Sequence, residues 1–115
     1  MGVALVTPFK TDESVDFESL GRLIEYQIEN GTDYLVVLGT TAETATLTDT
    51  EQKEITQFVI DKVSGRVPLV LGVGGNNTRA VIEKVQQVDA RKISAVLCVT
   101  PYYNKPSQEG LYQHY

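Results

Sequence analysis

The sequence predicts an α/β chain with a parallel sheet, and three observations support this fold class. Short apolar runs begin near residues 3, 34, 67 and 93, so one pattern recurs about every thirty residues, the length of a strand-helix unit. Segments with apolar residues at helical spacing separate these runs. The run Tyr34–Leu38 consists of strand-forming residues, as expected of a strand buried on both faces of a parallel sheet. We therefore expect functional side chains beyond the carboxyl ends of the strands.

The first unit has clear start and stop signals. Val3–Val6 is the first predicted strand, and it ends at Thr7-Pro8 because proline has no amide hydrogen for the strand ladder. Asp16 is placed to cap a helix with apolar residues at helical spacing. Asn30-Gly31 ends that helix, since glycine accepts the left-handed backbone that often follows one. The strand Tyr34–Leu38 then begins the second unit.

The second helix and the third strand carry similar signals. Thr48 and Glu51 match the capping box, in which each side chain accepts a hydrogen bond from a backbone amide at the start of a helix. Gly65 is predicted to end this helix, and Val67–Val73 is predicted to be the third strand.

The last units follow the same order. Gly74–Asn77 lacks the spacing of phosphate-binding glycine motifs, so it is interpreted as a tight turn into a third helix. A fourth strand is predicted over Ile93–Val99, and Ser107 is placed to cap a further helix. The helical pattern runs to Tyr115 with no glycine cap and no return strand.

Pattern and length leave two architectures open. One is a complete four-stranded doubly wound domain with a frayed last helix. The other is the first half of an eight-unit barrel, which needs roughly 250 residues and would leave the first and fourth strands as open edges.

Composition argues against several classes of function. Ten Lys and Arg against fifteen Asp and Glu give a net charge of -5, so no basic surface is expected to bind nucleic acid. No apolar stretch approaches the ~20 residues that span a bilayer, so no membrane role is expected. Cys98 is the only cysteine, which fits a reducing compartment and predicts a cytoplasmic protein. His114 is the only histidine, so a histidine-based triad or metal site is not expected.

Polar side chains follow the carboxyl end of every predicted strand. Threonine and tyrosine hydroxyls can donate one proton while accepting another, which suits proton relay and carboxylate binding. Thr40 and Thr41 could instead satisfy loop amides. Glu43 could be a solvated loop acid or hold the backbone amides of the loop, and this structural role is favoured. Tyr102 and Tyr103 are adjacent in a short turn and cannot both enter one core, so one is predicted to project outward. No lysine is placed on a strand, where desolvation would favour an imine.

Two segments of the chain carry longer motifs: Gly39–Leu47, with the sequence GTTAETATL, and Val99–Leu111, with the sequence VTPYYNKPSQEGL. Together these motifs resemble the 4-hydroxy-tetrahydrodipicolinate synthase (dihydrodipicolinate synthase) family of pyruvate-dependent class I aldolases. Val6–Phe9 is similar to the end of the family's first strand, so the resemblance covers essentially the whole chain. It implies an α/β fold of the TIM (β/α)8 barrel family. Residues 1–115 would be the amino-terminal half-barrel of a single domain, about the first three and a half βα units, truncated before the Schiff-base lysine.

The resemblance also implies a reaction and site residues. In the family, a lysine on a later strand forms a Schiff base with pyruvate, which then attacks L-aspartate-4-semialdehyde in lysine and diaminopimelate biosynthesis. Thr40 would be the relay threonine, and Thr41 would hold the pyruvate carboxylate through its hydroxyl and amide. Tyr103 would be the relay tyrosine that crosses a tight dimer interface into the neighbouring subunit's site.

The resemblance therefore implies that the full-length parent is a cytoplasmic lyase that needs no cofactor and no metal. It also implies a homotetramer built from two tight dimers. This chain lacks the imine lysine and is expected to be inactive alone.

The sequence departs from the family pattern at two places. Ala42 stands where the family usually has glycine, and its methyl group restricts the backbone if that position needs a positive φ. Family members that lysine inhibits bind it with a histidine and a glutamate. The histidine would align near Gln52 or Asp49, and the glutamate would align at Ala80, so this sequence has neither side chain. The resemblance therefore does not extend to lysine feedback inhibition.

Two alternatives remain. The first is an N-acetylneuraminate lyase or 2-keto-3-deoxy sugar-acid aldolase of the same superfamily. Thr40 and the sequence Tyr102–Asn104 favour the synthase over this alternative. The second is a non-catalytic half-barrel fragment that assembles through its open edges.

Overall fold

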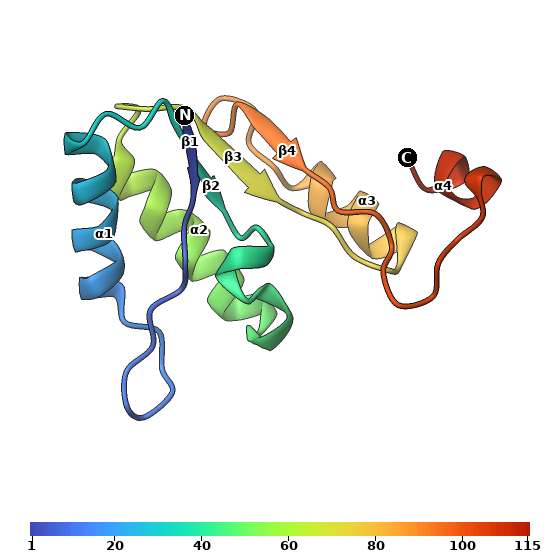
Figure 1. Ribbon diagram of the computed structural model, residues 1–115, viewed down its shortest axis with the longest axis horizontal. Helices are drawn as coiled ribbons and strands as arrows, with labels where there is room; N and C mark the ends of the chain where they lie inside the picture. Colours follow the sequence, from blue (N-terminus) through green and yellow to red (C-terminus); the bar gives the residue numbers. More distant parts are fainter.

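The computed structural model describes residues 1–115 and contains one four-stranded parallel sheet with the order β1-β2-β3-β4 (Figure 1). The strands are β1 (Gly2–Ala4), β2 (Tyr34–Val37), β3 (Leu69–Gly72) and β4 (Ala95–Leu97). The helices are α1 (Phe17–Glu29), α2 (Asp49–Val63), α3 (Thr78–Gln86) and α4 (Gln108–His114), and two short 3₁₀ turns, η1 (Thr40–Ala42) and η2 (Thr44–Thr46), follow β2. The predicted alternation of strands and helices is confirmed.

The strand order decides between the two architectures. Each strand pairs in parallel with the one before it, so the sheet grows along one direction only. A doubly wound sheet would instead reverse direction at a switch point. Consecutive parallel strands with open edges at β1 and β4 are the arrangement of successive units in a (β/α)8 barrel. The barrel fold class is therefore confirmed, and the doubly wound alternative is wrong.

The core lies between one face of the sheet and the helices α1 and α2 (Figure 1). Leu35 and Val37 of β2 point to this face, and their side chains are 0% and 2% exposed. The rings of Phe17 and Phe58 pack at a centroid distance of 5.1 Å and join the two helices. The largest fully buried side chains are Leu20, Ile24, Leu35, Val37, Val59 and Val63.

The opposite face of the sheet is open. Tyr34 of β2 is 41% exposed, and Leu97 of β4, in register with Gly72, is 49% exposed. The prediction that Tyr34–Leu38 is buried on both faces is therefore wrong, because no part of this chain covers the second face. In a (β/α)8 barrel, side chains from the other strands fill that space.

The strands are shorter than predicted, and β2 shows why. It ends at Val37 because Leu38 has a φ of +53°, a left-handed conformation that cannot continue a strand. The Leu38 carbonyl then lies so close to Gly72 that a Cβ at residue 72 would clash with it. Helix α2 ends at Val63, and Ser64 and Gly65 then both take left-handed conformations, so the prediction that Gly65 ends this helix is confirmed. None of the helices is both long and apolar enough to cross a membrane.

Candidate functional site

The carboxyl ends of the parallel strands meet at one edge of the sheet, and three polar loops follow them there (Figure 1). The turn η1 follows β2, the Gly74–Asn77 loop joins β3 to α3, and a longer segment with Tyr102 and Tyr103 joins β4 to α4. The polar residues predicted at the strand ends therefore belong to a single edge of the molecule.

The turn η1 presents two threonine side chains. Its backbone is closed by hydrogen bonds from the Ala42 amide to the Gly39 carbonyl (3.0 Å) and from the Glu43 amide to the Thr40 carbonyl (3.1 Å). Thr40 and Thr41 are both exposed, and neither hydroxyl bonds to a protein group. The interpretation that these hydroxyls satisfy loop amides is therefore wrong, and both are available to a ligand.

A buried threonine holds this turn in place. The Thr7 hydroxyl, beyond the end of β1, donates a 2.8 Å hydrogen bond to the Ala42 carbonyl. Thr7 is only 5% exposed, so this bond ties η1 to the neighbouring strand inside the protein. The sequence placed Thr7 at the correct edge but did not reveal its partner, which is 35 residues away.

Alanine at position 42, where glycine was expected from the family pattern, does not strain the turn. Ala42 is buried with an ordinary negative φ, and the left-handed residue is Glu43, with a φ of 56°. The Glu43 carbonyl accepts hydrogen bonds from the Thr46 amide and hydroxyl, both at 2.9 Å. The Glu43 carboxylate itself bonds to nothing in the chain, so the prediction of a structural role for this side chain is wrong and only its backbone serves the turn.

The two adjacent tyrosines project into solvent. Tyr103 is 94% exposed and Tyr102 is 53% exposed, and neither phenol makes a hydrogen bond within the chain. The prediction that one of them points outward is confirmed. No hydrogen bond joins the Tyr103 phenol to Thr40 or Thr41, and 94% of Tyr103 is exposed, so a single copy of this chain does not link the three hydroxyls.

Helix α4 is anchored at the far end of the tyrosine segment. The Ser107 hydroxyl caps the helix by accepting the Gly110 amide at 3.1 Å. His114 Nδ1 and the Thr78 hydroxyl share a 2.8 Å hydrogen bond. The Tyr115 hydroxyl donates to the Cys98 carbonyl at 3.2 Å, and partial desolvation, followed by the Cys98 contacts, raises the pKa of Tyr115. Two side chains near the carboxyl terminus therefore hold α4 against α3 and β4.

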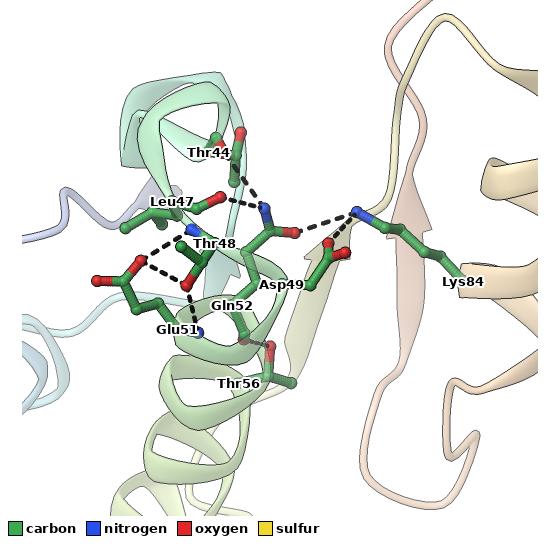
Figure 2. Close-up of polar contacts among 8 residues, drawn as sticks. All are labelled: Thr44, Leu47, Thr48, Asp49, Glu51, Gln52, Thr56 and Lys84. Carbon is green, nitrogen blue, oxygen red and sulfur yellow. Dashed lines mark hydrogen bonds and ion pairs between the residues drawn. The ribbon is translucent and has the colours of Figure 1, made fainter.

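Figure 2 shows a second polar cluster, at the start of α2. The Gln52 amide donates to the carbonyls of Thr44 (3.2 Å) and Leu47 (3.1 Å), which joins η2 to the helix. Lys84 of α3 donates to the Gln52 side-chain oxygen at 3.2 Å and lies 3.4 Å from the Asp49 carboxylate. These contacts cross a groove of about 380 Å³ between α2 and α3. Lys84 of α3 therefore joins Asp49 and Gln52 of α2 across this groove.

No lysine of this chain has the environment of an imine-forming residue. Every lysine is exposed, and each lies in a loop or on a helix. An imine-forming lysine is activated by desolvation in an apolar pocket, and none of these exposed lysines is desolvated. The prediction that the strands of this chain carry no such lysine is confirmed.

Comparisons with known proteins agree with this geometry. The model of the dihydrodipicolinate synthetase family matches residues 1–115. The 4-hydroxy-tetrahydrodipicolinate synthases of Parabacteroides distasonis and Phocaeicola vulgatus are 66% and 59% identical to the chain over 115 residues, all of it. The chain spans 39% of the length of each of these relatives.

Solved structures show the same relationship. The chloride-inhibited dihydrodipicolinate synthase of Acinetobacter baumannii, complexed with pyruvate, matches 98% of this chain with a TM-score of 0.93 and 45% identity. The enzyme of Thermotoga maritima matches 98% with a TM-score of 0.91 and 47% identity. The chain covers 39% and 38% of those two structures. By sequence and by fold, this chain belongs to the dihydrodipicolinate synthetase family.

Proposed function

We propose that this chain supplies the pyruvate-positioning and proton-relay part of a 4-hydroxy-tetrahydrodipicolinate synthase site. In that reaction, pyruvate is held as a Schiff base on a lysine and condenses with L-aspartate-4-semialdehyde. The observation that carries the proposal is the pair of unbonded threonine hydroxyls on η1, a turn that Thr7 fixes at the carboxyl edge of the sheet. The pyruvate bound in the Acinetobacter baumannii relative supports the choice of substrate.

The two threonines have different proposed roles. Thr40 relays protons, because a hydroxyl can donate and accept at once. Thr41 holds the pyruvate carboxylate through its hydroxyl and its backbone amide, since amides at the start of a helical turn have no acceptor within the turn. The rigid backbone of η1 supports both roles, because proton transfer and carboxylate binding need fixed positions.

Tyr103 has a proposed role outside its own subunit. Its side chain is almost fully exposed, and its phenol makes no hydrogen bond within the chain. A relay that includes both groups therefore needs Tyr103 from a second copy, which supports a homo-oligomer with a tight dimer and a tetramer formed from two such dimers. Tyr102 lies beside it and would be closer to that interface.

The proposal places residues 1–115 in the amino-terminal half of one barrel domain. The imine lysine is then supplied by a later strand, and the chain alone is inactive. The open apolar face supports this placement, because barrel interiors are filled by side chains from all eight strands. A single, half-buried cysteine is compatible with the proposed cytoplasmic location.

Borohydride trapping tests the proposal. A hybrid protein is made by joining this chain to the remaining residues of the Parabacteroides distasonis relative. We expect the hybrid to gain one pyruvate adduct in its intact mass after reduction, and the 115-residue chain to gain none. An adduct on any lysine of this chain would contradict the proposal.

Turnover separates the roles of the hydroxyls. Thr40→Val in the hybrid is expected to lower kcat for the condensation and to leave the trapped adduct in place, since the imine forms on another residue. Thr41→Val is expected to raise KM for pyruvate. Thr46→Val is the matched control, because Thr46 is an exposed threonine in the adjacent turn η2. Cleavage of N-acetylneuraminate instead of condensation with aspartate semialdehyde would indicate the sugar-acid lyase alternative.

A further inference from the structure

The backbone of Tyr103 is held in an uncommon conformation. Its φ is +70°, and the Asn104 amide donates to the Tyr102 carbonyl at 3.0 Å, which closes a three-residue turn. Three-residue turns with a positive central φ are rare and strained, above all when the central residue has a bulky side chain. Such a conformation persists only where the surrounding structure holds it.

One side chain from another loop holds this turn. The Asn76 side-chain oxygen accepts a 2.8 Å hydrogen bond from the Tyr102 amide. The Tyr102 carbonyl closes the turn, so both backbone polar groups of this residue are in use. The Tyr103 phenol bonds to nothing in the chain, and its position therefore depends on the backbone of the turn.

Two close contacts between neighbouring chain segments bring Asn76 within hydrogen-bonding distance of the Tyr102 amide. The Val73 amide donates to the Leu97 carbonyl at 3.1 Å, which extends the pairing of β3 and β4 toward the loops. At Gly74 a Cβ would clash with the side chain and amide of Val99, so the two chain segments can pass this closely only because residue 74 is glycine. The neighbouring Asn77 has a different task, because its side chain caps α3 by accepting the Ala80 amide at 3.3 Å.

We propose that Asn76 is a positioning residue for Tyr103. Its side-chain oxygen holds the strained turn and so determines where the Tyr103 phenol is presented to a neighbouring subunit. The inference rests on the proposed relay role of Tyr103, but the contact itself can be measured separately.

Kinetics of the hybrid protein test the effect on turnover. Asn76→Ala is expected to lower kcat by about tenfold or more, because small displacements of a catalytic group are costly, while KM for pyruvate stays unchanged. Asn76→Asp keeps the acceptor oxygen and is expected to restore most of kcat. Asn77→Ala is the matched control: it removes a helix cap one residue away and is expected to loosen α3 locally without lowering kcat.

Hydrogen exchange of the Tyr102 amide tests the contact directly. Exchange is expected to accelerate in Asn76→Ala and to stay at the parent rate in Asn76→Asp and Asn77→Ala. This measurement does not need turnover, so a hybrid that fails to condense its substrates would contradict the proposed function, and exchange would still decide whether Asn76 holds the turn. In an active hybrid, an Asn76→Ala variant with either the parent exchange rate or the parent kcat would overturn the inference.

Discussion

The first two strand-helix units and the last two differ sharply in how well they are packed. All the largest fully buried side chains lie between residues 20 and 63, in α1, β2 and α2. The later half instead exposes large apolar side chains on α3, β4 and the segment after β4. These residues are Ile82, Val85, Val96, Leu97 and Val99.

The difference shows that burial depends on neighbours more than on pattern. Both halves have apolar residues at strand and helix spacing, but α1 and α2 pack against each other through Phe17 and Phe58. A groove separates α2 from α3, and the Lys84 contacts cross it. The proposed site takes one part from each half. Thr40 stands on a turn tied to the core by Thr7, whereas Tyr103 stands on a turn held by Asn76.

Replacing one isoleucine in each half by alanine should give the largest difference in stability between the two halves. Ile24→Ala is expected to lower the free energy of unfolding by about 2–5 kcal/mol, because the side chain is fully buried and leaves a cavity. Ile82→Ala on α3 is expected to change it by less than about 0.5 kcal/mol, since half of that side chain is already in water. Urea unfolding of the 115-residue chain measures both. Equal losses would show that the two halves are equally packed.

The Thr7 contact should have the next largest effect. Thr7→Val keeps the shape of the side chain but leaves the buried Ala42 carbonyl without a donor, at an expected cost of about 1–3 kcal/mol. Thr46→Val removes an exposed hydroxyl from the Glu43 carbonyl and is expected to cost less than about 1 kcal/mol. Urea midpoints of the two variants provide the comparison. If Thr7→Val leaves the urea midpoint unchanged, other contacts hold η1 in place.

Helix caps should sharpen the comparison between the halves. The Thr48 hydroxyl accepts the Glu51 amide at 3.2 Å, and Thr48→Ala is expected to cost about 1 kcal/mol of global stability because α2 is part of the core. Asn77→Ala is expected to act locally and to increase hydrogen exchange in α3 while the unfolding midpoint changes little. If Asn77→Ala shifts the unfolding midpoint as much as Thr48→Ala does, α3 unfolds together with the core.

The smallest expected effect is a pH dependence within the packed half. Hydrogen bonds from Arg66 and then Lys62 lower the pKa of Glu25 from 4.5 to about 2. A lowered pKa stabilises the fold above pH 4.5, and this contribution disappears as the pH falls toward 2. Glu25→Gln should therefore lower the thermal midpoint slightly at pH 7 and match the parent near pH 2. Glu54→Gln, at an exposed glutamate without an ion pair, is the control. A Glu25→Gln deficit that persists at pH 2 would indicate lost packing.

Local signals made much of the fold predictable. Asp16 caps α1 and Thr48 forms the capping box of α2, as expected, because caps act over three residues. The end of β2 was placed one residue too late, since nothing in the sequence marks Leu38 as left-handed. The family resemblance pointed to Thr40, Thr41 and Tyr103, whose catalytic roles remain predictions. Neither the Thr7 bond nor the Asn76 bond could be found this way, because each joins loops many residues apart.

The sequence by itself determined the alternation of strands and helices, the positions of the caps and the polar character of each strand end. These features follow from period, turn chemistry and backbone preference, all of which act within a few residues. Only the tertiary structure decided the strand order, the face of the sheet that remains open and the partners that hold the two proposed catalytic turns. Those properties depend on which distant segments meet, and a short pattern of residues contains no information about its neighbours in space.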